Sequence, residues 1–286
     1  MSSSKHSTSM NIPVPSIATG SPDDGQQRPI TICLLGDFRV LQGSQIMPFR
    51  AGGKSETVLA YLALQGANPL SRTTLVNLLW PGMAPTLASH SLSNVVLTLQ
   101  KLLAPALQGA PPFVHQTGFL SLNVAAGIGI DICYFDELGQ LGDRHAEGGD
   151  IPTAMSYYTR AALWYRGDLC IAVDPRTIME RERLRARCLT LLSQLTDYHF
   201  RSGDTTTCLD HLWHLLAVDP CHEEAHRMVM RCYMRQGQRG AALRQYHLCV
   251  DLLHTRFGAV PETATVALYE QFRDEPKLLG SDMIET

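Results

Sequence analysis

The stretch GDTTTCLDHLWHLLAVDPCHEEAHRMVMRCYMRQGQRGAALRQY, residues 203–246, contains a repeating pattern. Gly203 and Gly237 lie 34 residues apart, and each is followed five places later by a small residue and nine places later by a large apolar one. Gly149 starts the same pattern once more. The small residues are Ala154, Cys208 and Ala242, and the large ones are Tyr158, Leu212 and Tyr246. A period of 34 residues is typical of tetratricopeptide repeats, which are stacked pairs of antiparallel helices. The pattern predicts such pairs here, with the glycines where two helices approach closely.

The same stretch contains His222-Glu223-Glu224-Ala225-His226, which fits the zinc-protease pattern H-E-x-x-H. On a helix this spacing places two imidazoles on one face, where they can bind a metal. The surrounding context is missing, because Val229 and Cys232 stand where the longer metzincin motif requires Gly and His. A zinc hydrolase using His222, Glu223 and His226 is therefore the least favoured alternative.

A structural explanation of the same residues is available. Asp219 is a typical N-cap and Pro220 a typical first residue of a helix. Two glutamates in a first turn favour the positive end of the helix dipole. We therefore expect His222 in the first turn of a repeat helix. His211 and His214 lie close by in the sequence, and we interpret them as packing residues, with no metal expected.

Length and composition indicate about two domains with well-formed cores, since the chain has 286 residues of which 45% are hydrophobic. No apolar run approaches the roughly 20 residues that a membrane span needs, so no membrane contact is expected. Eight scattered cysteines without a C-x-x-C pair indicate reduced thiols and a cytoplasmic location. Residues 1–29 are rich in Ser, Pro, Gly and Gln, which predicts a disordered tail, and 273–286 form a second tail.

Residues 30–125 follow the order of a winged helix-turn-helix fold. Short apolar runs in 30–49 predict a small antiparallel sheet, and helical periodicity follows at 54–66, 71–80 and 84–105. The stretch PFVHQTGFLSLNV, residues 112–124, predicts a β-hairpin with Gly118 near its turn. From about Asp131 onward the pattern is helical throughout. The fold class is therefore α+β, mostly α, with a winged helix followed by an all-α tetratricopeptide-like domain.

Several stretches together resemble the SARP-type bacterial regulators, which combine an OmpR-type winged helix with a bacterial transcriptional activation domain. In the front half they are LLGDFRV, KSETVLAYLAL, SRTTLVNLLWP and HQTGFLSL, and in the back half DICYFDEL, YRGDL and FGAVPE. The resemblance covers roughly residues 30 to 270. It implies a DNA-binding domain at 30–125 and an activation domain at 131–272. It also implies a transcriptional activator that binds repeats in double-stranded promoter DNA and contacts RNA polymerase or a second copy of itself.

The third helix of a winged helix can enter the major groove, and the hairpin can touch the DNA backbone. The exposed side of the third helix is expected to carry polar residues, together with Leu97. Here the helix departs from the family, because the usual arginine after a leucine and the next basic residue are missing in Leu97-Thr98-Leu99-Gln100-Lys101. The candidate DNA-binding residues are Arg50, Lys54, Arg72, His90, Ser93, Asn94, Thr98, Lys101, Gln116 and Thr117.

The shortage of basic residues leaves a second class of function open. Lysine and arginine supply most of the affinity for DNA, and the third helix offers only Lys101. A protein-interaction adaptor whose winged helix no longer reads DNA is therefore the main alternative. No P-loop, G-x-S-x-G elbow or paired-carboxylate pattern occurs, so neither catalysis nor a cofactor is expected.

Overall fold

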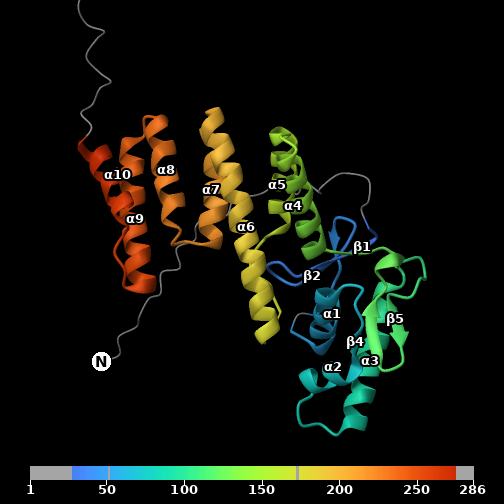
Figure 1. Cartoon of the computed structure of the whole chain (residues 1–286). Coiled ribbons are helices and arrows are strands. Elements are labelled where there is room, and N and C mark those ends of the chain that lie inside the picture. The colour runs from blue at the N-terminus through green and yellow to red at the C-terminus, as the bar shows by residue number, and fades with distance from the viewer. Residues whose placement is uncertain (1–27, 51, 172–173, 275–286) are drawn as a thin grey trace, which may run out of the picture. The chain divides into compact units, whose positions relative to one another are not determined.

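We describe residues 28–50, 52–171 and 174–274 in a computed structural model of the chain (Figure 1). The chain forms two compact units, which divide between Leu191 and Leu192, inside helix α6 (Pro175–Ser202). The domain limits expected from the sequence, 30–125 and 131–272, stay predictions. The two expected tails lie largely outside the described residues.

The first sheet begins as the sequence predicts. Strands β1 (Ile30–Cys33), β2 (Arg39–Gln42) and β3 (Gln45–Ile46) form an antiparallel meander. A fourth strand, β7 (Ile128–Ile130), then joins β1 in parallel, which gives the order β3-β2-β1-β7. Three residues are too few to show the alternation that marks a strand, so β7 was not predicted.

The winged helix-turn-helix fold is confirmed. Helices α1 (Lys54–Gln65), α2 (Arg72–Leu79) and α3 (Pro85–Leu103) are followed by a hairpin of β5 (Phe113–Gln116) and β6 (Phe119–Leu122). The short strand β4 (Leu70–Ser71) pairs with β6, so the hairpin is bonded to the start of α2. The core-facing residues of the three helices are fully buried, among them Leu59, Leu62, Leu75, Leu92 and Leu99.

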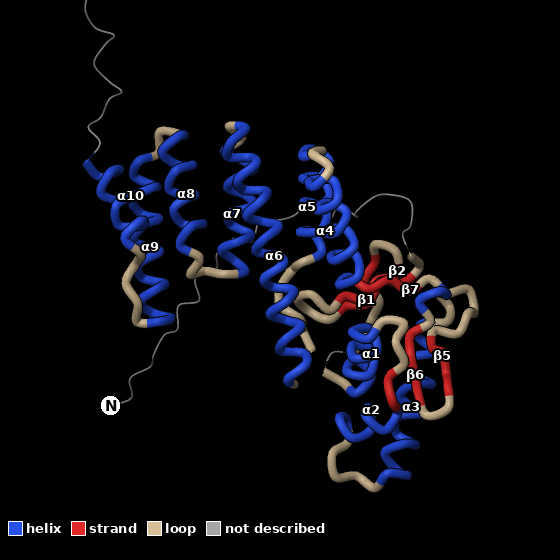
Figure 2. The backbone as a smooth tube through the Cα atoms, in the orientation of Figure 1, coloured by secondary structure: helices blue, strands red, loops and turns tan. Residues whose placement is uncertain are grey.

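Within the described residues, every named element after β7 is a helix, as predicted (Figure 2). A short 3-10 turn, η1 (Val124–Ala126), precedes β7. In the second unit, the last three helices pack around Met230, Ala242 and Phe272. The remaining helices are α4 (Asp131–Glu147), α5 (Ile151–Trp164), α7 (Thr205–Val218), α8 (Glu223–Arg235), α9 (Arg239–Phe257) and α10 (Thr263–Asp274).

The repeating glycines have a different role from the one expected. Gly149, Gly203 and Gly237 each have a positive φ and occupy the turn just before a helix, and a Cβ at any of them would meet no atom within 4 Å. They are turn residues in the left-handed region, which glycine adopts at little cost. The small residues five places later are fully buried, as the pattern predicted.

Close approach of helices is instead provided by a glycine inside α4. A Cβ at Gly142 would lie 2.4 Å from the ring of Tyr158 in α5, which is 1% exposed. The Tyr158 hydroxyl also donates a 2.9 Å hydrogen bond to Asp143. Helices α4 and α5 therefore pack as a tight pair, which is possible because glycine at position 142 has no side chain.

A buried carboxylate connects the first sheet to the helices of the same unit. Asp131, the first residue of α4, is 1% exposed and accepts hydrogen bonds from the amides of Leu34 and Leu35, both at 2.8 Å, and of Ile132 at 2.9 Å. Burial raises the pKa of Asp131 to about 6, while the three amide bonds act in the opposite direction. The group is therefore mostly ionised at neutral pH, and its charge is satisfied by backbone donors.

Replacing Asp131 tests this connection. Asp131→Asn exchanges one acceptor oxygen for an N–H group that must face a backbone donor, so we expect a loss of roughly 1–3 kcal/mol in the free energy of unfolding. Urea denaturation followed by circular dichroism measures the change. Asp37→Asn, at an exposed aspartate in the loop before β2, is the matched control. Equal stability of the two variants would contradict the role given to Asp131.

A second prediction concerns the α4–α5 pair. Gly142→Ala forces Tyr158 to move, at a cost of about 1–3 kcal/mol, partly offset by the roughly 1 kcal/mol better helix propensity of alanine. We expect a net loss of up to about 2 kcal/mol. Gly148→Ala is the control, because its Cβ would come no closer than 3.4 Å to another atom. The idea fails if Gly142→Ala unfolds at the same or a higher urea concentration than the control.

Candidate nucleic-acid interface

The outward face of α3 is polar apart from Leu97 and carries no carboxylate. The buried side consists of Ala88, Leu92, Val96, Leu99 and Leu103. The predicted outward residues are all exposed, and they are His90, Ser93, Asn94, Leu97, Thr98 and Lys101. The periodicity of the sequence therefore placed this face correctly, because apolar residues at helical spacing must turn to the core.

Two hydroxyl groups of this face are bonded to the helix itself. The Ser93 hydroxyl donates to the Ser89 carbonyl at 3.0 Å, and the Thr98 hydroxyl donates to the Asn94 carbonyl at 2.9 Å. Both oxygens can then only accept further hydrogen bonds. The side-chain amide of Asn94 has no hydrogen-bond partner within the described part of the chain. Both its N–H donors and its oxygen acceptor are therefore available.

Arg72 connects α2 to this face. Its guanidinium donates to the Ser93 hydroxyl at 2.9 Å, and its backbone amide donates to Gly118 in the turn of the hairpin. Arg72, Ser93, Val96, Leu97, Gln100 and His115 line a shallow groove of about 370 Å³. The groove brings together residues of three elements, α2, α3 and β5.

The other candidate cations differ in availability. Arg50 is exposed in the loop before α1, and Lys101 is exposed near the end of α3. Lys54 is engaged, since its ammonium donates to the carbonyl of Leu79 at 2.6 Å and lies 5.8 Å from the ring centre of Trp80. Lys54 therefore caps the end of α2, a role that its position in the sequence did not indicate.

The hairpin presents the remaining candidates. Gln116 ends β5 and Thr117 follows it in the turn, and both are exposed. Gly118 has a φ of 77°, so the turn depends on glycine at this position. Sequence reasoning did not include Gln100 and His115 among the site residues. Gln100 follows Ser93 by seven residues, two helical turns, which was the available signal.

The H-E-x-x-H segment is not arranged for zinc, and its helix starts later than predicted. Pro220 lies in a turn, α8 begins at Glu223, and His222 is its N-cap, with a ring nitrogen that accepts from the Ala225 amide at 3.2 Å. His226 is 1% exposed. Its Nε2 donates to the Pro220 carbonyl at 2.9 Å, and its Nδ1 accepts from the Gln245 amide at 2.7 Å. Neither ring nitrogen of His226 has a lone pair left for a metal.

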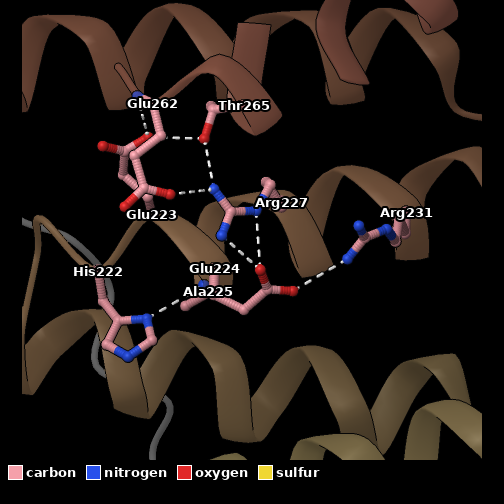
Figure 3. A network of polar contacts seen from close by, with 8 residues as sticks. All are labelled: His222, Glu223, Glu224, Ala225, Arg227, Arg231, Glu262 and Thr265. Atoms are coloured by element: carbon pink, nitrogen blue, oxygen red, sulfur yellow. Dashed lines mark hydrogen bonds and ion pairs between the residues drawn. The ribbon is translucent and has the colours of Figure 1, made fainter. Parts of the chain in front are cut away.

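The glutamates of this segment connect it to residues at the start of α10, the last helix of the described part of the chain (Figure 3). Glu223 accepts hydrogen bonds from the Thr265 hydroxyl at 2.6 Å and the Glu262 amide at 2.9 Å. Arg227 lies between Glu224 and Glu262 and also donates to Thr265. Burial raises the pKa of Glu224, but its bonds to Arg227 and Arg231 outweigh that and leave the pKa below the usual value. The segment therefore holds α10 against α8.

The other histidines form no metal centre in the part of the chain that the structure describes. His211 lies with its ring 5.5 Å from that of His199. Burial, followed by the charges of His199 and His214, lowers the pKa of His211 to about 4. It is therefore neutral at pH 7, and its ring packs from α7 against His199 of α6.

Comparison with known proteins gives a consistent result. Residues 130–273 match the model of the bacterial transcriptional activator domain. The regulatory protein DnrI of Streptomyces peucetius is 27% identical over 228 residues, which are 77% of this chain and 82% of DnrI. EmbR of Mycobacterium tuberculosis, solved in complex with a low-affinity phosphopeptide, superimposes with a TM-score of 0.64 at 20% identity, over 87% of this chain. This chain spans 66% of that EmbR chain, and the likeness shows the fold alone.

A winged helix joined to helical hairpins defines a class of transcriptional regulators. Because the matching residues make up half of the chain, this protein belongs to the bacterial transcriptional activator domain family. It is a regulator of the SARP type, and the family is one of regulators, not of enzymes. Within the described residues, no helix is long and apolar enough to span a bilayer.

The buried position of His226 predicts a pH dependence. Burial lowers the pKa of His226 below 6.5, although the bond to Pro220 acts in the opposite direction. At a pH between the folded and the unfolded pKa of His226, the unfolded chain binds a proton at this residue and the folded chain does not. Stability is therefore lost as pH falls below about 6.5, until the folded pKa is reached. We expect His226→Gln to flatten this part of the curve of unfolding free energy against pH.

The control for this measurement is His90→Gln, at an exposed histidine of the winged helix. Identical slopes for His226→Gln and the unaltered protein would show that His226 does not titrate differently in the folded state.

Proposed function

We propose that this regulator binds double-stranded promoter DNA through α3 and the β5–β6 hairpin and thereby activates transcription. The helical part that follows would contact RNA polymerase or a second copy of the chain, in the cytoplasm. No catalytic step is part of the proposal. It rests on the family and on one observation, a helix face that is exposed, free of carboxylates and polar except at Leu97.

The shape of the site supports insertion of α3 into the major groove. A recognition helix presents one row of three or four side chains to the base edges. His90, Asn94, Leu97 and Lys101 are spaced by four, three and four residues, so they form such a row. The hairpin is bonded to the start of α2 and stands beside α3, where Gln116 and Thr117 can reach phosphates.

The charges near this face are few but unopposed. Among the described residues, Arg50, Arg72 and Lys101 form no ion pair with a carboxylate. Each phosphate that a cation neutralises makes the slope of log affinity against log salt concentration more negative by about 0.9. If these three cations are the contacts, the slope is about −3, which is shallow for a DNA-binding protein.

The low number of cations is also consistent with the alternative function, a protein-interaction adaptor. An adaptor with a winged helix that no longer reads DNA would show no saturable binding even at low salt. A gel-shift titration of the full chain against the region upstream of its own gene, repeated at rising salt, separates the two functions. Saturable binding with a negative salt slope supports the regulator, and its absence would overturn the proposal.

Single substitutions identify the reading helix. Asn94→Ala should weaken binding to the preferred site by about 5- to 150-fold, because a bidentate contact to a base contributes about 1–3 kcal/mol of discrimination. Lys101→Ala should weaken binding to all sequences and make the salt slope shallower by about one unit.

The matched control is Arg201→Ala, which removes one exposed positive charge at the end of α6. It should leave affinity and salt slope unchanged. Unchanged binding by both Asn94→Ala and Lys101→Ala would show that α3 is not the reader.

A further inference from the structure

Leu97 is an exposed apolar residue in the middle of the proposed reading row. Its side chain is 50% exposed, whereas Leu92 and Leu99 of the same helix are at most 1% exposed. A single exposed leucine is common on protein surfaces and carries no conclusion by itself. Leu97, however, also lines the groove that Arg72, Gln100 and His115 border. Leu97 therefore lies beside polar and basic side chains of the candidate interface.

The neighbour of Leu97 in the row is Asn94, one turn before it. Residues three apart on a helix are separated by about 4.5 Å along the axis, and neighbouring base pairs by about 3.4 Å. The two side chains can therefore reach the same or adjacent base pairs. The Asn94 amide has no other hydrogen-bond partner among the described residues, so nothing in the fold competes for it.

The chemistry of these two side chains limits what they can recognise. In the major groove the apolar group offered by an unmodified base is the C5 methyl of thymine, and the bidentate partner of an asparagine is adenine through N6 and N7. Neither contact requires a charge on the protein. This agrees with a helix whose only formal charge is Lys101 and which has no carboxylate to repel DNA.

Resting on the proposed function, we propose that Leu97 contacts a thymine methyl group and that Asn94 pairs with an adenine beside it. The preferred site of this regulator then contains a short A·T step at the position of Leu97. Specificity comes from one methyl contact and one amide contact, and the cations Arg72 and Lys101 only hold the duplex in place.

Deoxyuridine provides a direct test, because it differs from thymidine only by the missing methyl group. Preferred duplexes are first selected with the full chain from a randomised 30-base-pair library. Each thymine of the selected site is then replaced singly by deoxyuridine, and affinities are compared. We expect one replacement to weaken binding about fourfold, the effect of one buried methyl group. At the adjacent adenine, 7-deazaadenine, which lacks the N7 acceptor, should also weaken binding.

Variants assign the two effects to residues. Leu97→Ala should bind the thymine and uracil duplexes equally, and Asn94→Ala should lose only the response to 7-deazaadenine. Leu78→Ala, at a leucine of α2 that is 41% exposed, is the matched control and should keep both responses. Melting curves of each variant verify that it is folded.

The possible results distinguish the two proposals. If duplexes are selected and bound but no thymine is sensitive to its methyl group, the assignment of Leu97 is wrong while DNA binding stands. The same holds if Leu97→Ala keeps the preference for thymine. If no duplex is enriched or bound at low salt, both the proposed function and this inference are overturned, and Leu97 belongs to a protein-contact surface.

Discussion

The carboxylate of Asp131 lies where the first sheet meets the pair of helices α4 and α5 in the same unit. Strand β7 runs parallel to β1 with Ile130 opposite Ile32, so the next residue, Asp131, comes beside the end of β1. There the Leu34 and Leu35 amides, which follow the last residue of β1, both donate to Asp131. Leu35 then forms a β-bridge with Leu169, just after α5. A buried charge is stable only when such donors surround it, so this junction requires the chain on both sides to be folded.

Each repeat of the helical part depends on its turn. The glycines before α5, α7 and α9 adopt a positive φ, and Asp150 and Asp204 then cap the following helix by accepting from the amide three residues on. A short, well-capped turn brings the next helix back against its neighbour. The fully buried Ala154, Cys208 and Ala242 lie one turn further on, where a larger side chain would not fit without movement.

The H-E-x-x-H segment illustrates how one spacing serves two chemistries. A metal site needs free imidazole nitrogens on an open face. Here the same spacing gives a capping histidine, a buried histidine with both nitrogens bonded, and two glutamates that hold α10 and Arg227. On α3, in contrast, the Asn94 amide remains free of partners in the described structure, which is the condition that a reading surface requires.

Much of this protein follows from the sequence alone, because burial of apolar residues with a period of two or 3.6 is a local property. The meander, the three helices of the winged helix, the hairpin and the outward residues of α3 were predictable in this way. Tertiary structure alone decided the rest. These features join residues that are separated in the chain. They are the parallel pairing of β7, the hydrogen bond from Lys54 to the Leu79 carbonyl, the two hydrogen bonds of the His226 ring, and the groove between Arg72, Gln100 and His115. No local pattern records which distant donor meets which acceptor, so these contacts become visible only when the chain is folded.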